Sequence, residues 1–371
     1  PGFRLPRVWK FSVGIDKELP WWGLIATADY QHIKVRDAIY YQNMNIGAPT
    51  GVLPDGRFTY YKNPTKDPRS SGQQSRYLAN GAFSDGTINL ANSSRGSADS
   101  LALSLKKPFS ENWFGTVGYT WSRATEVNGG NSSVANSNYK YTAWVNPNQN
   151  QAVISQYSIP NRIIASLNCR HHFFGYYATS VGAFYDGHSG SPFSWVFGND
   201  ANGDSYATDL DYIPKPGDIE FAPGTTAQQQ QQFFDFIKSD KYLNQHQGQI
   251  ADTNGARASW LNQIDLSFQQ EVPGFLKGNK GIVRLDIFNF TNLLNKHWGV
   301  EHRGNFSTAG GGRALADSAG VDPVTGKYIY NISGASYKDA NGNYHPLDLP
   351  INEFNNPSQR WSLLLTLKYT F

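Results

Sequence analysis

The chain has 371 residues, and its 32 basic and 29 acidic side chains give a formal net charge of only +3 at pH 7. This balance excludes the strongly basic patch that nucleic-acid binding needs, so we expect no nucleic-acid partner. Hydrophobic residues make up 39% and charged residues 16% of the chain, below the roughly 45–50% and 25% of soluble domains, whereas glycine and aromatic residues are abundant. This composition favours strands and turns over a helical bundle.

Membrane insertion by helices is also excluded, because no apolar run approaches the roughly 18–20 residues that a spanning helix needs. The mean hydropathy of -0.51 is that of a hydrophilic protein. A transmembrane β-barrel remains possible, since its strands alternate between lipid and lumen and contain no long apolar run. The single cysteine, Cys169, excludes a disulfide framework and a Cys-based metal site. The chain begins with Pro1 and has no signal pattern, so we expect a mature, processed or partial chain.

Period-two alternation predicts two hairpins in the first third of the chain. Residues 8–16 place apolar side chains on one face, and after the turn from Leu19 to Gly23 a second strand covers about 24–40. Residues 99–107 alternate in the same way, turn at 108–112, and return through Val117, Tyr119 and Trp121. We expect each pair to be antiparallel.

Two further hairpins and a terminal strand complete the pattern. They cover 161–173 with 176–187, 260–270 with 281–292, and finally 361–371, which gives nine strands. In the terminal strand the odd positions are apolar or aromatic and the even ones polar apart from Leu364, which suits a tilted transmembrane strand of about 9–11 residues. The residues expected to face lipid include Trp9, Phe11, Tyr119, Trp121, Leu365 and Leu367. Those expected to line the lumen are Lys10, Asp16, Asp29, Gln31, Arg170, Asp265, Arg284 and Asp286.

The connections alternate between short turns and long intervals, the latter near 45–95, 128–158, 188–258 and 299–357. Loops beyond about 12–15 residues are uncommon in soluble domains, but outer-membrane barrels have short periplasmic turns and long extracellular loops. The alternative, a soluble β-sandwich or propeller, does not explain this rhythm. Within one interval, residues 226–243 have the pattern of an amphipathic helix. We therefore predict an all-β, transmembrane antiparallel barrel in a bacterial outer membrane.

Several segments resemble the TonB-dependent outer-membrane receptors, and within them the Oar-like group. The run Asn289-Phe290-Thr291-Asn292-Leu293-Leu294-Asn295 with the terminal Tyr369-Thr370-Phe371 is typical of the superfamily. The segments 112–128, 184–192 and 198–214 (GNDANGDSYATDLDYIP) also carry the resemblance, and the run NDANGD in the last of them points to the subgroup.

The resemblance implies a 22-stranded barrel whose lumen is closed by an amino-terminal plug, with a TonB box that couples it to a TonB-type energising protein. This chain departs from that pattern, because it contains about nine strands and no plug or TonB box. We therefore expect residues 1–371 to be the C-terminal part of the barrel, completed by another chain or a longer precursor, because unpaired strand edges are not viable in lipid.

The resemblance also implies an assembly signal that the barrel-assembly machinery reads, carried by Trp361, Leu363, Leu365, Leu367, Tyr369 and Phe371. The alternative is that Phe371 only packs in the aromatic girdle.

Oxygen-bearing side chains alternate around a glycine in the segment 200–211, at Asp200, Asn202, Asp204, Asp209 and Asp211. Donors at this spacing can surround a hard cation, so calcium is a candidate cofactor, although the bidentate Glu of an EF-hand is missing. Residues 339–343 are a weaker copy. The alternative is an Asx-rich turn without metal.

The expected function is uptake of a bulky nutrient, such as a siderophore, peptide or glycan, by a plugged receptor. The main alternative is an Oar-like adhesion or scaffold protein that binds proteins or glycans without transport. An outer-membrane hydrolase is the least favoured hypothesis. Ser189 and Ser191 lie near His188 and Asp186, but sequence neighbours at a strand end point to opposite faces. We expect no catalytic residues, and as partners the outer-membrane lipid and lipopolysaccharide.

Overall fold

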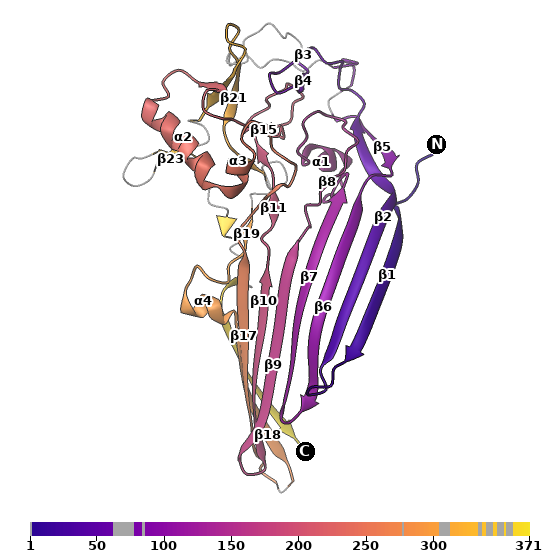
Figure 1. Cartoon of the computed structure of the whole chain (residues 1–371), viewed down its shortest axis with the longest axis vertical. Coiled ribbons are helices and arrows are strands. Elements are labelled where there is room, and N and C mark those ends of the chain that lie inside the picture. Colours follow the sequence, from indigo (N-terminus) through magenta and orange to yellow (C-terminus); the bar gives the residue numbers. More distant parts are fainter. Residues whose placement is uncertain are drawn as a thin grey trace.

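The computed structural model describes residues 2–61, 78–83, 86–276, 278–303, 312–332, 336–338, 344–346, 352–353 and 359–371. Its main feature is one large antiparallel sheet, built of consecutive hairpins (Figure 1). The strands along the sheet are β1 (Arg7–Glu18), β2 (Ile25–Asn43), β6 (Ser97–Ser110), β7 (Trp113–Glu126), β9 (Asn161–Phe174), β10 (Tyr177–His188), β17 (Leu261–Pro273), β18 (Lys280–Phe288) and β26 (Ser362–Thr370).

These are the nine strands that the alternation predicted. Two short strands branch off the path, β5 (Ile88–Ser93) on β2 and β8 (Val153–Ile154) on β7. In the described part of the chain β1 and β26 do not pair with each other, so the sheet is curved but open. Glu111 and Asn112, which join β6 to β7, both have positive φ (50° and 69°), as in the two-residue type I′ turns that match strand twist.

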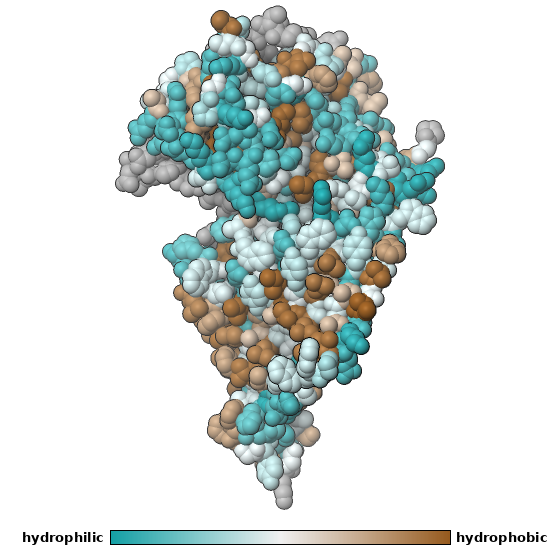
Figure 2. Space-filling model, in the orientation of Figure 1, coloured by the Kyte–Doolittle hydropathy of each residue, from teal (hydrophilic) through white to brown (hydrophobic). Residues whose placement is uncertain are grey.

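The strand register gathers the apolar side chains on one face, because residues directly opposite each other in a ladder share a face. One such row runs through Ile15, Ala28, Leu103, Tyr119 and Ile163. The six residues expected to face lipid all lie on this face, with exposed fractions from 37% for Tyr119 to 72% for Leu367. Figure 2 shows the resulting hydrophobic colours across the strands, below a hydrophilic upper region.

The opposite face of the sheet is polar and contains all eight residues expected in the lumen. Arg170 forms an ion pair with Glu271 at 3.0 Å, and Arg284 forms one with Asp286 at 2.9 Å. A polar face of this kind is what a water-filled barrel interior requires. We call it the lumen face, and the apolar one the lipid face.

One predicted strand was too long: the strand expected over 281–292 ends at Phe288. Asn289 adopts a left-handed conformation (φ 51°) and begins a short helix, α4 (Phe290–Leu294). Asn tolerates this conformation better than most residues, and its side chain accepts a hydrogen bond from the Asn292 backbone N–H. This local bond ends the strand despite the apolar Phe290 and Leu293.

The long connections fold together at the end of the sheet opposite the short turns (Figure 1). We call the described parts of 44–61, 78–83, 127–160, 189–260, 299–303 and 312–332 the dome. It contains the helices α1 (Ala135–Lys140), α2 (Ala227–Ser239) and α3 (Lys241–Gln245). Its strands are β3 (Gly51–Val52), β4 (Phe58–Thr59), β11 (Pro192–Phe193), β12 (Trp195–Val196), β13 (Tyr212–Ile213), β14 (Ile219–Phe221), β15 (Gln249–Ile250), β16 (Ala256–Arg257), β19 (His302–Arg303), β20 (Arg313–Ala314), β21 (Asp317–Val321) and β22 (Tyr328–Asn331). Three further short strands are β23 (Ser336–Lys338), β24 (Tyr344–Pro346) and β25 (Asn352–Glu353).

The helix predicted over 226–243 is confirmed as α2 and α3, divided at Asp240. Thr226 and Gln229 form a capping box at the start of α2, and the Asp240 side chain caps α3, so two sets of free backbone N–H groups are satisfied. Phe233 and Ile237 on α2 are fully buried. They join a core that includes Trp195, Phe197 and Tyr330.

Distant segments of the dome are also joined by backbone pairing. The strands β12 and β20 pair in parallel, as do β14 and β22. The dome is therefore a folded unit and not a set of independent loops. Among the described residues, no helix has the length and apolarity that crossing a membrane would require.

Candidate functional site

The segment from Asp200 to Asp211 lies within the dome and begins with a tight turn. The Asp200 carboxylate accepts hydrogen bonds from the backbone N–H groups of Gly203 (2.6 Å), Asp204 (3.2 Å) and Ser205 (2.7 Å). Gly203 has φ +83°, and a Cβ there would lie 2.5 Å from the Tyr61 ring. Glycine is therefore required both for the turn and for the approach of Tyr61.

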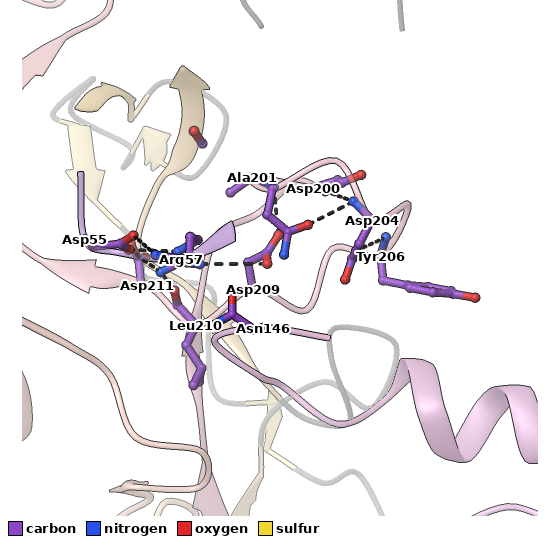
Figure 3. A network of polar contacts seen from close by, with 12 residues as sticks. Asp55, Arg57, Asn146, Asp200, Ala201, Asp204, Tyr206, Asp209, Leu210 and Asp211 are labelled. Carbon is purple, nitrogen blue, oxygen red and sulfur yellow. Dashed lines mark hydrogen bonds and ion pairs between the residues drawn. The ribbon is translucent and has the colours of Figure 1, made fainter. Parts of the chain in front are cut away.

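The turn brings three of the five predicted ligands together. One carboxylate oxygen from each of Asp200, Asp204 and Asp209 lies within 4.8 Å of the others (Figure 3). Asn202 is also buried at this turn, where its side-chain oxygen accepts a hydrogen bond from the Asp204 N–H at 2.9 Å. The structure thus gathers a compact set of oxygen donors from one short segment.

Asp211, the fifth predicted ligand, is not part of this group. Its carboxylate accepts a hydrogen bond from the backbone N–H of Leu315 at 3.2 Å and contacts the Tyr330 hydroxyl at 3.1 Å. Asp211 therefore ties the segment to β22 and to the residues after β20. The weaker copy at 339–343 lies outside the described residues.

A buried cation, Arg57, adjoins the group and was not found by the sequence analysis. Its guanidinium forms an ion pair with Asp55 at 2.7 Å, lies 3.8 Å from an Asp209 oxygen and donates a hydrogen bond to the Leu210 carbonyl (Figure 3). It also lies over the Phe197 ring, 5.3 Å from its centre. Arg57 and Asp55 belong to a polar turn without periodicity, so no sequence signal relates them to residues some 150 positions away.

Burial dominates the electrostatics of these groups. Burial raises the pKa of Asp209 to about 8, with Arg57 opposing the shift and Asp200 adding to it. Burial also raises the pKa of Asp211 to about 8, and it raises the pKa of Asp200 against the backbone hydrogen bonds that lower it. Burial works against the charge of Arg57, but Tyr328, Asp55 and Asp209 hold its pKa above the ordinary value.

This donor set fits a hard cation. Three carboxylates and an amide oxygen supply only oxygen ligands, which calcium prefers, and each carboxylate retains lone pairs beyond its turn hydrogen bonds. A divalent cation would stabilise the ionised carboxylates that burial disfavours. The same hydrogen bonds also form in an Asx-rich turn without metal, and we propose calcium as the ligand of this donor set.

The predicted assembly segment forms β26 at the edge of the sheet, paired with β18 over its full length. Leu363, Leu365 and Leu367 lie on the lipid face opposite Ile287, Leu285 and Val283. The Tyr369 hydroxyl accepts hydrogen bonds from the Phe275 N–H at 2.9 Å and the Asn279 side chain at 3.3 Å. The Phe371 ring contacts only the Tyr369 ring among the described ring contacts, at 5.0 Å, and is 95% exposed. Trp361 precedes the strand and is also exposed.

Two asparagines of the run 289–295, Asn289 and Asn292, hold the start of β26 in place. Asn289 is fully buried, and its amide donates to the carbonyls of Gly299 at 2.9 Å and Gln359 at 2.8 Å. Asn292 donates to the Trp298 carbonyl and accepts from the Trp361 N–H at 3.3 Å. The two asparagines therefore fasten both ends of the 299–359 connection to the top of β18.

The comparisons with known proteins agree with this architecture. The family model described as an outer membrane beta barrel domain matches residues 1–314. The chain therefore belongs to this family, and the sheet is part of the wall of an outer-membrane β-barrel. Since the short turns of such barrels face the periplasm and the long loops face outward, the dome lies on the extracellular side. A search of curated proteins found no match.

Proposed function

We propose that the chain forms the C-terminal barrel wall of a TonB-dependent receptor, and that the dome captures a bulky nutrient outside the cell. The observation that carries this proposal is the dome itself. Its connections share a buried core and parallel strand pairs, and a pre-ordered surface loses less conformational entropy on binding than flexible loops do.

The open sheet supports the remaining part of the proposal. β1 and β26 each have one edge without a partner in the described chain, and such edges are not tolerated in lipid. Additional strands must close the barrel, and we propose that they come from the same protein together with a plug. The lumen of a barrel widens with the number of strands, and a barrel of about 22 strands, the number that the resemblance implies, has a lumen wide enough to hold a plug. The barrel-assembly machinery would insert the barrel into the outer membrane. A TonB-type protein would supply the energy for transport.

The competing function is adhesion or scaffolding by an Oar-like protein, for which a rigid dome is equally suitable. Energy dependence separates the two. Cells with and without the intact protein are incubated with a labelled siderophore, peptide or glycan, in the presence and absence of a protonophore. Transport predicts internalised label that the protonophore abolishes, whereas adhesion predicts surface label that the protonophore leaves unchanged.

A second experiment tests the missing parts directly. The gene is read upstream of the codon for Pro1, and a TonB box found there is replaced by a neutral sequence. The proposal predicts loss of uptake with normal amounts of folded barrel. Unchanged uptake, or the absence of any plug-coding region in the gene and its neighbours, would contradict it.

A further inference from the structure

A basic groove lies at the upper end of the first strands, where β2 changes partners. β2 pairs with β6 from Ile25 to Lys34 and with β5 from Ala38 to Asn43. The groove between these two regions has a volume of about 630 Å³. It is lined by Trp9, Lys34, Val35, Arg36, Ser93, Ser94, Arg95 and Asn150.

The groove follows from the local backbone. The register between β1 and β2 shifts, because Val8 is opposite Val35 whereas Arg7 is opposite Asp37. Arg36 therefore has no residue opposite it, as in a β-bulge. The connection from β5 to β6 passes at the same level, where the Ser93 hydroxyl donates to the Asn150 side chain at 2.7 Å.

Three cations surround the groove without compensation. Lys34, Arg36 and Arg95 are exposed, and no acidic residue lines the groove. The nearby Asp37 already pairs with Arg7 at 2.6 Å. Within the described ranges, no side-chain ion pair or hydrogen bond involves any of the three cations. They are therefore available to an anionic ligand.

The position of the groove relative to the apolar band of the lipid face indicates which kind of anion it binds. Trp9 lies directly opposite Lys34 on the lipid face, and Phe11, Val13 and Ile15 continue this face of β1 toward the periplasm. Aromatic residues with cations beside them, at the border of an apolar band, mark the headgroup level of a membrane.

The neighbouring strands are polar at the same level of the lipid face. Asp99 accepts a hydrogen bond from the Tyr30 hydroxyl at 2.7 Å and lies 2.8 Å from the His32 ring nitrogen. Arg123 is directly opposite Asp99. The border of the apolar band therefore continues across β1, β2, β6 and β7, and the groove lies in the outer leaflet.

We propose that this groove binds the phosphate group of a phosphorylated glycolipid of the outer leaflet. The headgroup phosphate lies among Lys34, Arg36 and Arg95, and the acyl chains lie against the apolar residues of β1 below Trp9. The guanidinium groups supply paired N–H donors that match phosphate oxygens. This inference goes beyond the proposed function and does not rest on it, since either a transporter or an adhesin would lie in the same membrane.

The test compares two matched triple variants of the full-length protein in detergent micelles. One variant is Lys34→Gln/Arg36→Gln/Arg95→Gln, and the control is Lys215→Gln/Lys238→Gln/Lys241→Gln, which removes three exposed cations from the dome. Each protein is titrated with bisphosphorylated lipid A, and bound lipid is counted by native mass spectrometry. A cation at a membrane surface contributes roughly a fivefold factor in affinity, so we expect the groove variant to bind at least about tenfold more weakly than the control.

Two further arms identify the source of the phosphate. Lipid A without phosphate is expected to bind as weakly to the wild type as the bisphosphorylated form binds to the groove variant, and millimolar inorganic phosphate is expected not to displace bound lipid A. Equal affinity of the two triple variants, equal binding of the dephosphorylated lipid, or displacement by inorganic phosphate would each overturn the proposal. Arg95→Gln alone, on an exposed connection, serves if the triple variant does not fold.

Discussion

The sheet and the dome place their apolar side chains differently: the sheet directs them outward, and the dome packs them in its interior. In the sheet the large apolar residues point outward from the barrel wall and remain exposed in the isolated chain, as Phe11 and Leu367 do. In the dome Trp195, Phe233 and Tyr330 are fully buried against one another. The dome also buries the Arg57–Asp55 ion pair, whereas the ion pairs of Arg170 with Glu271 and of Arg284 with Asp286 lie on the lumen face of the sheet.

This difference reflects the two environments of one chain, which are water for the dome and lipid for the sheet. The dome gains its stability from removing apolar surface from water, as soluble domains do. The sheet gains it from matching its outer face to lipid and from pairing every backbone group. Substitutions should therefore have different effects in the two regions, and the following predictions test this, from the largest expected effect to the smallest.

The largest effect is expected for Arg57→Met in the dome. Removing the cation leaves its close partner Asp55 buried without compensation, which typically costs about 3–5 kcal/mol. Hydrogen exchange should show the dome opening while the sheet stays protected, and the exposed Lys238→Met should change neither region. Loss of protection in the sheet to the same extent would show that the dome and the sheet are one cooperative unit.

A charge on the lipid face of the sheet comes next. Leu365→Arg places a cation on the lipid face at the middle of β26, which costs about 2–4 kcal/mol at the bilayer midplane. Its neighbour Leu364 lies on the lumen face opposite Asp286, so Leu364→Arg should be nearly neutral. Folding into vesicles, followed by gel mobility without heating, measures the difference. Equal yields for the two variants would mean that the two faces are assigned wrongly.

Calcium binding by the dome would stabilise it without affecting the sheet. At a concentration 100 times the Kd, calcium should add about 2.7 kcal/mol to the free energy of unfolding, visible as a higher Tm of the dome by tryptophan fluorescence. Asp204→Ala should abolish the increase, whereas Asp252→Ala, an exposed acid elsewhere in the dome, should retain it. A Tm that responds to neither calcium nor a chelator leaves the Asx turn as the explanation.

The pH dependence of the dome should report on Asp211. Burial raises its pKa to about 8, above the unfolded value of about 3.9, so the folded state binds the extra proton. The free energy of unfolding should therefore fall as pH rises from about 4 to about 8. The protonated carboxyl can donate to the Tyr330 hydroxyl, which in turn donates to the Tyr212 carbonyl. Burial shifts the pKa of Asp209 in the same way, so Asp211→Asn should reduce the slope in calcium-free buffer without abolishing it, and an unchanged slope would assign it to other groups.

The smallest effect on stability is expected from deletion of Phe371, which should instead reduce insertion a few-fold. As a control, Phe275→Ala removes another exposed ring at the same rim, which stacks on Tyr369 at 5.7 Å. The signal hypothesis predicts slower membrane insertion for the Phe371 deletion alone, with normal stability once the protein is inserted. If both variants insert normally, Phe371 only packs in the girdle.

The sheet could be predicted from the sequence because its constraints are local. Alternation along residues such as Leu101, Leu103 and Leu105 specifies the lipid face, and turns such as 108–112 specify which strands pair. Where a local side-chain bond competes, this reasoning fails, as it did at Asn289. There the positive φ and the cap on Asn292 ended a strand that the apolar pattern extended.

The candidate site could be predicted only in part for the same reason. Asp200 and Asp204 are close because a short turn joins them, and the spacing around Gly203 reveals that turn. Arg57 reaches Asp209 only through the packing of separate connections, and Asp211 is drawn away by Tyr330. Such contacts depend on the tertiary structure of the dome, which leaves no periodic signal in the sequence.

The hydrogen bonds of Asn289 to both Gly299 and Gln359 have a consequence for how this protein can diversify. Because the two ends of the connection are fastened at one point, the register of β26 on β18 does not depend on the residues between them. Insertions or exchanges in the exposed turn 323–326 can therefore alter the surface of the dome while the pairing of β26 with β18 stays in place. Gly299 itself cannot vary, because a Cβ there would lie 2.0 Å from the Asn289 side-chain oxygen. Selection can thus change the connection in the dome and leave the pairing of β26 with β18 unchanged.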